Sequence, residues 1–289
     1  MTEDPRFQPV MFVQNLMYRA LIGVLLVLPY ETRLRFGGWV FSRLVAPLAG
    51  YGTRVRENLA LVWPELPQDR VEQLVRQVPA NAGRTLIEQF SPTAFKATVA
   101  GTPITGPGLA ALFEARAAGK GVVLVSGHFG NYDVVRAVLA AQGHKVGGLF
   151  KPLSNRYFDP YYRATIDAIS TPAFAKGRRG LAGMVQFLRA GGLIGMLIDQ
   201  HQIRAPQLRF FGHPARTALS AADLALKYDT LLVPCYAIRQ PDGVHFELVI
   251  EDPIPQGSPE AMTQALNDSL EARVRQHPEQ YFWIHRRWK

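Results

Sequence analysis

His128 and Asp133 are the two residues of this sequence whose types and spacing best suit acid–base chemistry. A neutral imidazole can take a proton from a hydroxyl group near pH 7, and a nearby carboxylate can fix its tautomer and stabilise the imidazolium. The alternative is structural: a capping histidine, followed by an aspartate that suits the dipole at the start of a helix. The spacing indicates a base with an orienting carboxylate and leaves the structural alternative open.

The surroundings of this pair favour a site. Residues 122–125 form a short β-branched apolar run typical of a buried strand, and a helical pattern begins at Asp133 and ends near Gly143. In open α/β sheets, ligands bind beyond the carboxyl ends of the strands, where a loop enters the next helix. His128 lies at such a corner of the predicted fold.

A second carboxylate follows another predicted strand. Residues 193–198 form a buried apolar run that ends at Asp199. Parallel strands bring their carboxyl ends to one edge of a sheet. We therefore expect Asp199 to lie near His128.

Strands and helices alternate through the body of the chain, which predicts an α/β fold with a mainly parallel sheet flanked by helices. Further strands are expected at 145–150, 231–238 and 245–250, and helices at 68–78, 80–90 and 259–276.

Composition limits the function classes. With 289 residues and 48% hydrophobic residues, the chain forms one large domain or two small ones. A net charge of +9 favours an acidic partner: nucleic acid, anionic lipid or an acidic carrier protein. The single cysteine, Cys235, excludes an intrachain disulfide and a cysteine-based zinc site, and its apolar neighbours predict an inert buried thiol.

The N-terminal region is apolar but interrupted. Residues 20–30 form an apolar run without charges, whereas the apolar run at 34–50 contains Arg35 and Arg43. Neither run reaches the roughly 18 residues of a membrane span. We predict one or two membrane-surface helices within 11–50, against the alternative of a buried helical hairpin. The expected division is a membrane-associated segment at 1–50 and a catalytic domain at 51–289. No cleavable signal peptide is expected.

Two basic segments suggest phosphate contacts. Adjacent arginines between glycines, at Arg178 and Arg179, suit a phosphate-binding turn, although a solvated basic turn has the same composition. The tail at 281–289 mixes aromatic and basic residues, as at a membrane interface or a phosphate site.

Several chemistries are excluded by missing motifs. The chain has no Gly-x-Ser-x-Gly elbow, no Walker loop, no Gly-x-Gly-x-x-Gly after a strand and no His-Glu-x-x-His. No nucleic-acid-binding motif accompanies its basic charge, so nucleic acid is not expected as a partner.

Taken together, five ordered motifs resemble the bacterial lipid A late acyltransferases and their relatives, the phosphatidylinositol mannoside acyltransferases. They span most of the chain: Gly127-His128-Phe129-Gly130-Asn131-Tyr132-Asp133; Lys151-Pro152-Leu153-Ser154-Asn155; Asp199-Gln200; Phe210-Phe211-Gly212 with Ala215 and Thr217; and Trp283-Ile284-His285-Arg286-Arg287.

The resemblance implies acyl transfer from a thioester to a lipid hydroxyl, on a glycerolphosphate-acyltransferase-like αβα sandwich. It implies His128 as the general base, Asp133 as the carboxylate that orients it, and Asp199 as a second acid behind it. The oxyanion would be stabilised by backbone amides near Gly130 and Asn131, or by an arginine. No cofactor or metal is expected. Substrate contacts are assigned to Asn131, Lys151, Arg178, Arg179, Arg204 and Arg209.

The implied partners are an acidic acyl carrier protein as donor, an anionic lipid A precursor as acceptor, and the cytoplasmic face of the bacterial inner membrane. Two departures leave the acceptor open to other glycolipids or aminolipids: Asp133 stands where lipid A enzymes commonly have Glu, and His201 follows Gln200 where an Asp is frequent. Acyl-CoA remains open as donor. Two rival classes are a thioester or lipid hydrolase that uses the same residues with water, and a non-catalytic lipid-binding protein.

Overall fold

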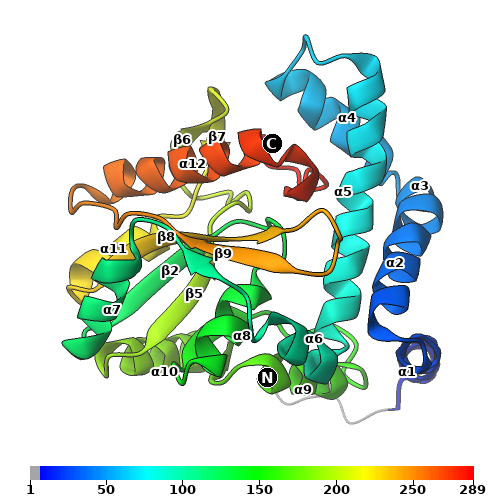
Figure 1. Cartoon of the computed structure of the whole chain (residues 1–289), viewed down its shortest axis with the longest axis horizontal. Coiled ribbons are helices and arrows are strands. Elements are labelled where there is room, and N and C mark those ends of the chain that lie inside the picture. Colours follow the sequence, from blue (N-terminus) through cyan, green and yellow to red (C-terminus); the bar gives the residue numbers. More distant parts are fainter. Residues whose placement is uncertain (1–6) are drawn as a thin grey trace.

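Strand β2 lies inside a seven-stranded sheet of order β1-β9-β8-β2-β5-β3-β4 (Figure 1). All neighbours are parallel except β8 and β9, which form an antiparallel hairpin. The computed structural model describes residues 7–289 and confirms the predicted α/β class with a mainly parallel sheet. The strands of this sheet are β1 (Ile104–Thr105), β2 (Val122–Ser126), β3 (Val146–Phe150), β4 (Ala173–Ala175), β5 (Leu193–Leu197), β8 (Leu231–Arg239) and β9 (Phe246–Ile250).

Alternate side chains of β2 enter two separate cores because successive residues of a strand point to opposite faces. Val122 and Leu124 pack on the side of α7 and α8, whereas Val123 and Val125 pack on the side of α10 and α11. Both faces are therefore covered, as parallel sheets require. The covering helices are α6 (Pro92–Val99), α7 (Leu109–Ala117), α8 (Asp133–Ala141), α9 (Asp159–Ile169), α10 (Arg178–Arg189), α11 (Ser220–Lys227) and α12 (Pro259–Gln276).

Burial also accounts for Cys235 of β8. Its side chain is 1% exposed, and burial raises the pKa of the thiol to about 12. The thiol is thus the inert core residue predicted from its neighbours.

A third core closes the carboxyl edge of the sheet. It joins Leu59 of α4 (Tyr51–Val62) and Leu74 of α5 (Gln68–Gln89) to Phe210 of a small hairpin and to Trp283 of the C-terminal tail. The hairpin consists of β6 (Gln207–Phe210) and β7 (His213–Arg216), and a 3-10 turn, η2 (Pro278–Gln280), precedes the tail. Tyr281 and Trp283 are buried, so these two aromatics of the tail belong to this core and not to a membrane interface.

Helix α5 corrects the prediction of two helices separated by Pro79. It runs without interruption through Pro79 for 22 residues. Proline removes one backbone donor, but the helix continues because its buried face packs against the rest of the protein. Leu74 joins the third core, and Ile87 packs against Leu34. Tertiary packing outweighs the local helix-breaking tendency here.

The N-terminal helices lie beside α5 at one end of the molecule (Figure 1). They are α1 (Pro9–Val27), α2 (Tyr30–Val40), a π-helical turn, η1 (Phe41–Val45), and α3 (Ala46–Leu48). Leu34 of α2 is fully buried against Ile87 of α5.

Helix α1 differs from α2 in its exposure. It has 19 residues, and an 18-residue window within it has a mean hydropathy of 1.8 with only 11% of the window buried. By length and composition it could cross a membrane, which the interrupted sequence runs had not predicted. The division of the chain at residue 50 stays a prediction.

Candidate active site

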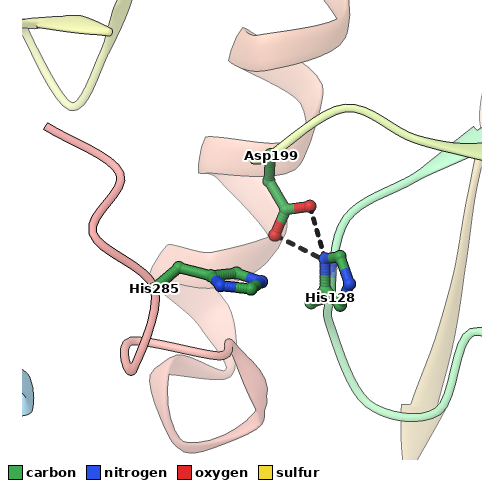
Figure 2. Close-up of side chains that lie close together, drawn as sticks. All are labelled: His128, Asp199 and His285. Atoms are coloured by element: carbon green, nitrogen blue, oxygen red, sulfur yellow. Dashed lines mark hydrogen bonds and ion pairs between the residues drawn. The ribbon is translucent and has the colours of Figure 1, made fainter. Parts of the chain in front are cut away.

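His128 and Asp199 form a direct pair at the carboxyl edge of the sheet (Figure 2). The Nδ1 atom of His128 lies 2.8 Å from one carboxylate oxygen of Asp199, and the backbone N–H of His128 donates to the other oxygen at 2.9 Å. Each residue comes two positions after its strand, and the register pairs Ser126 with Leu197. The parallel register therefore places the two side chains against each other, as expected from the sequence.

The electrostatics of this pair fix the histidine tautomer. Burial alone would raise the pKa of the Asp199 carboxyl, but the His128 charge and hydrogen bonds outweigh it and hold that pKa well below its usual range. An ionised carboxylate only accepts hydrogen bonds, so Nδ1 of His128 carries the hydrogen and Nε2 carries the lone pair, which lies 3.5 Å from the side-chain amide nitrogen of the exposed Gln200. The His128 side chain is 20% exposed, whereas that of Asp199 is 0% exposed. The imidazole is thus oriented from behind and open in front.

Asp133 has different partners from those predicted. It begins α8, is buried, and forms an ion pair with Arg136 at 3.0 Å. Arg136 also donates to the carbonyl oxygen of Ser170 at 2.5 Å. The carboxylate that contacts the His128 ring is therefore Asp199, because the turn after His128 directs Asp133 towards its own helix.

His285 is a third member of the site that the sequence analysis did not assign. Its ring centroid lies 4.6 Å from that of His128 in an edge-to-face arrangement (Figure 2). Burial, followed by repulsion from His128, lowers the pKa of His285 to about 4, so this imidazole is neutral at neutral pH. In the sequence, His285 stands out only by its place in the last of the five motifs. Its neighbours in the chain do not indicate that it meets His128, which lies 157 positions earlier.

Helix α4 fixes the segment that carries His285. Asn58 donates to the carbonyl oxygens of Trp283 and His285 at 2.7 and 2.9 Å, and Arg54 donates to that of Ile284 at 3.2 Å. Asn58 and Arg54 lie four residues apart, on one face of the helix. Three successive carbonyls of the tail are therefore held by one helix face.

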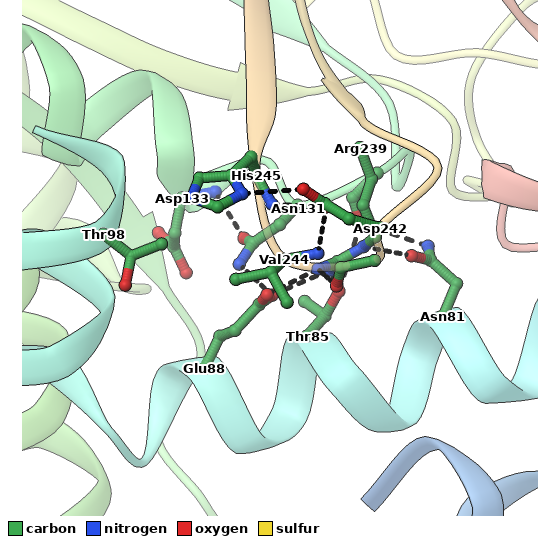
Figure 3. Close-up of polar contacts among 12 residues, drawn as sticks. Asn81, Thr85, Glu88, Thr98, Asn131, Asp133, Arg239, Asp242, Val244 and His245 are labelled. Atoms are coloured by element: carbon green, nitrogen blue, oxygen red, sulfur yellow. Dashed lines mark hydrogen bonds and ion pairs between the residues drawn. The ribbon is translucent and has the colours of Figure 1, made fainter. Parts of the chain in front are cut away.

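A buried polar network braces the turn after His128 (Figure 3). Arg239 binds both carboxylate oxygens of Glu88, at 2.5 and 2.8 Å, and Glu88 accepts from the Asn131 amide at 2.8 Å. The Asn131 side-chain oxygen accepts from the backbone N–H of Asp133 at 2.9 Å. Asn131 is 1% exposed, and the nitrogen and the oxygen of its side-chain amide are both hydrogen-bonded within the protein, so this residue braces the turn.

Gly130 connects the same network to α5. Its φ of +53° is a left-handed conformation that favours glycine, and a Cβ would lie 2.0 Å from the carbonyl oxygen of Ala237. Its carbonyl oxygen accepts from Thr85 and Asn81, and its N–H donates to the carbonyl oxygen of Gln280. That N–H is thus already used, which leaves the predicted oxyanion donor unassigned at this position.

The remaining predicted substrate contacts are all exposed, and they are spread along the sheet edge and the hairpin. Lys151 directly follows β3, Arg178 and Arg179 begin α10 after β4, Arg204 lies in the loop after Asp199, and Arg209 is in β6. Their contact with a substrate stays a prediction.

One group of side chains in residues 7–289 has the spacing of a metal site. Donor atoms of His128, Asp199 and His285 lie within 4.8 Å of one another. The hydrogen bond between His128 and Asp199 uses donor atoms that an ion would need. The paired arrangement suits proton transfer directly.

Comparison with known proteins identifies the family of this chain. The sequence model described as bacterial lipid A biosynthesis acyltransferase matches residues 3–289. The chain belongs to this family. It is an acyltransferase of the lipid A type, and the residues paired at the sheet edge lie within the matched region.

Individual relatives support the same assignment at low identity. The chain is 25% identical to the lipid A biosynthesis lauroyltransferase of Escherichia coli strain K12, over 100% of this chain and 97% of that protein. It is 25% identical to the palmitoleoyltransferase of the same strain, over 87% and 88%. It is 26% identical to the phosphatidylinositol mannoside acyltransferase of Mycolicibacterium smegmatis, over 81% and 79%.

We predict that Glu88→Gln destabilises the protein by about 3 kcal/mol, because it leaves the Arg239 guanidinium buried without its counter-charge. The measurement is the urea-unfolding free energy. The matched control is Glu72→Gln, which breaks the exposed pair with Arg56 and should cost less than about 1 kcal/mol. Equal losses in the two variants would contradict the bracing role of the network.

A second prediction concerns pH. The pKa of His285 is about 4 in the folded protein against an ordinary value of 6.5, so the unfolded chain binds its proton more readily. The resulting stability is present in full above about pH 6.5 and is lost as the pH falls towards 4. Between pH 7 and pH 5 we expect a loss of about 1–2 kcal/mol from this residue. Urea unfolding of His285→Asn at both pH values should show a smaller loss than wild type; an identical loss contradicts the assignment.

Proposed function

We propose that this enzyme transfers a fatty acyl chain from an acyl carrier protein thioester to a hydroxyl group of a lipid A precursor. The observation that carries the proposal is the open His128 imidazole, oriented from behind by the ionised Asp199. The family match supplies the reaction class, and the names of the lipid A relatives support the acceptor.

In the proposed reaction, Nε2 of His128 accepts the proton of the acceptor hydroxyl while the hydroxyl oxygen attacks the thioester carbonyl carbon. Asp199 stabilises the imidazolium that forms and holds its ring in place. The tetrahedral intermediate then collapses, the carbon–sulfur bond breaks, and the imidazolium returns its proton to the leaving thiolate. An ester and a free thiol result, with the enzyme restored.

We further propose that the enzyme works on the cytoplasmic face of the inner membrane, with α1 in the bilayer. Seven apolar side chains of α1 are more than half exposed, and a lipid surface would cover them. They are Val10, Val13, Leu16, Met17, Leu21, Val24 and Val27. A lipid acceptor requires such a location for the active site.

Substitutions of Asp199 and Asp133 test which of the two carboxylates serves His128. We expect His128→Ala and Asp199→Asn to lower kcat on the order of 10²-fold or more, because they remove the base and its orienting charge. Asp133→Asn should keep activity per folded molecule within about tenfold, since Asp133 pairs with Arg136, and should instead lower stability. The assay mixes purified enzyme, radiolabelled acyl carrier protein and the lipid A precursor, and separates the lipids.

Other results of this assay would change the proposed reaction, the acceptor or the base. Label that appears only as free fatty acid, with or without acceptor, would support a hydrolase. No product from the lipid A precursor, but product from a phosphatidylinositol mannoside, would move the acceptor to the class named for the mycobacterial relatives. An active His128→Ala variant would remove the proposed base.

For membrane association, we expect Leu21→Glu with Val24→Glu to shift the protein from sedimented vesicles to the supernatant. Both side chains are more than 60% exposed on α1, and placing two charges in the bilayer is unfavourable. The probe is a vesicle of phosphatidylethanolamine and phosphatidylglycerol. Leu181→Glu, at an exposed position of α10, is the control that should still sediment. Unchanged sedimentation of the α1 variant contradicts the proposal.

A further inference from the structure

A cleft lies between α4 and the C-terminal tail, beside the segment that carries His285. Its volume is about 540 Å³, which is within the range of small-molecule sites. One face of α4 and three residues of the tail form its walls. The lining residues are Gly50, Thr53, Arg54, Glu57, Asn58, Leu61, Arg286, Trp288 and Lys289.

The charged side chains of this cleft are mainly basic. Arg54, Arg286 and Lys289 face a single acidic side chain, that of Glu57. Within residues 7–289, no ion pair is described for these three cations, and only one guanidinium nitrogen of Arg54 is used by the tail carbonyl. The first turn of α4 adds the positive end of its dipole through Thr53. An anion in the cleft would therefore meet free donors from two segments.

The position of the cleft connects it to the reaction. Arg286 directly follows His285, whose ring contacts His128, and Asn58 lines the cleft while it holds the carbonyl oxygen of His285. A group bound here would lie beside the backbone that positions the active-site imidazole. Of the two basic segments that suggested phosphate contacts, the tail at 281–289 lines this cleft, whereas Arg178 and Arg179 do not.

We propose that this cleft binds a phosphate group of one of the two substrates of the proposed acyl transfer. Guanidinium groups and helix N-termini both match phosphate oxygens, and the leucine and tryptophan side chains suit an attached organic group. The proposal rests on the proposed function for the identity of the substrates. The phosphate has two sources: the headgroup of an anionic glycolipid acceptor, or the phosphopantetheine arm of the thioester donor.

An adjoining cleft gives the acceptor the stronger case. It has a volume of about 430 Å³, shares Gly50 and Thr53 with the first, and is lined by Arg43 and Pro47 of the N-terminal helical segment. Leu48, which follows Pro47 in that segment, is 90% exposed, so an exposed apolar side chain lies next to a residue that lines the adjoining cleft. An exposed apolar side chain at this place suits a lipid acceptor better than a donor carried by an acidic protein.

Direct binding tests the cleft without turnover. We titrate full-length, detergent-solubilised protein with inorganic pyrophosphate by calorimetry, for wild type, Arg286→Glu and Arg189→Glu. Arg189 is exposed on α10, outside the cleft, and its variant makes the same change of charge. We expect Arg286→Glu to weaken binding at least about tenfold, because a charge-assisted hydrogen bond is replaced by repulsion, and Arg189→Glu to match wild type.

Kinetics identify the source of the phosphate. If the acceptor supplies it, Arg286→Glu raises the KM for the phosphorylated acceptor about tenfold with kcat within about threefold, and a dephosphorylated acceptor abolishes the difference. If the donor supplies it, the KM for acyl carrier protein rises instead, and a short acyl thioester without phosphate abolishes the difference.

Two results overturn the proposal: pyrophosphate binding equal in all three proteins, or a fall in kcat with both KM values and pyrophosphate binding unchanged. The second would mean that Arg286 acts only through His285. If wild type transfers no acyl group to any acceptor, the proposed function fails, and the pyrophosphate titration still decides whether the cleft binds phosphate.

Discussion

The hydrogen-bonded contact between His128 and Asp199 depends on the parallel register of β2 and β5, and the rest of the site is arranged around it. Each of the two residues lies two positions after the end of its strand, so a shift of either strand would separate the side chains. Asp199 is fully buried and ionised, which is costly unless its oxygens are bonded. The ring and the backbone N–H of His128 supply both bonds. One buried charge thus fixes both the position and the tautomer of the imidazole.

Around this contact, polar side chains of α4 and α5 hold segments that are distant in sequence. Helix α5 supports the turn after His128 through Glu88 and Thr85, and α4 supports the tail through Asn58. Buried polar groups are tolerated only when satisfied, so each bond restricts the turn and the tail to one arrangement. This explains how a site assembled from loops is held rigidly while its front remains open to substrate.

The functional assignment joins three independent features of the molecule: an oriented base at the sheet edge, an exposed apolar helix, and a basic cleft behind the tail. An enzyme that moves an acyl chain onto an anionic lipid needs all three, because its acceptor is insoluble, charged and poorly nucleophilic. A soluble hydrolase would need only the first. The exposed apolar helix and the basic cleft therefore support the proposed transfer to an anionic lipid over hydrolysis of a soluble thioester.

The sequence by itself determined the parallel α/β fold, the strand ends at His128 and Asp199, the buried Cys235 and, through five ordered motifs, the family. These follow from local patterns of apolar residues and from short motifs, which one chain segment encodes alone. Tertiary structure decided which carboxylate pairs with His128, that α5 continues through Pro79, and that His285 joins the site. Each depends on contacts between segments far apart in the chain, where strand register and packing outweigh local spacing and propensity.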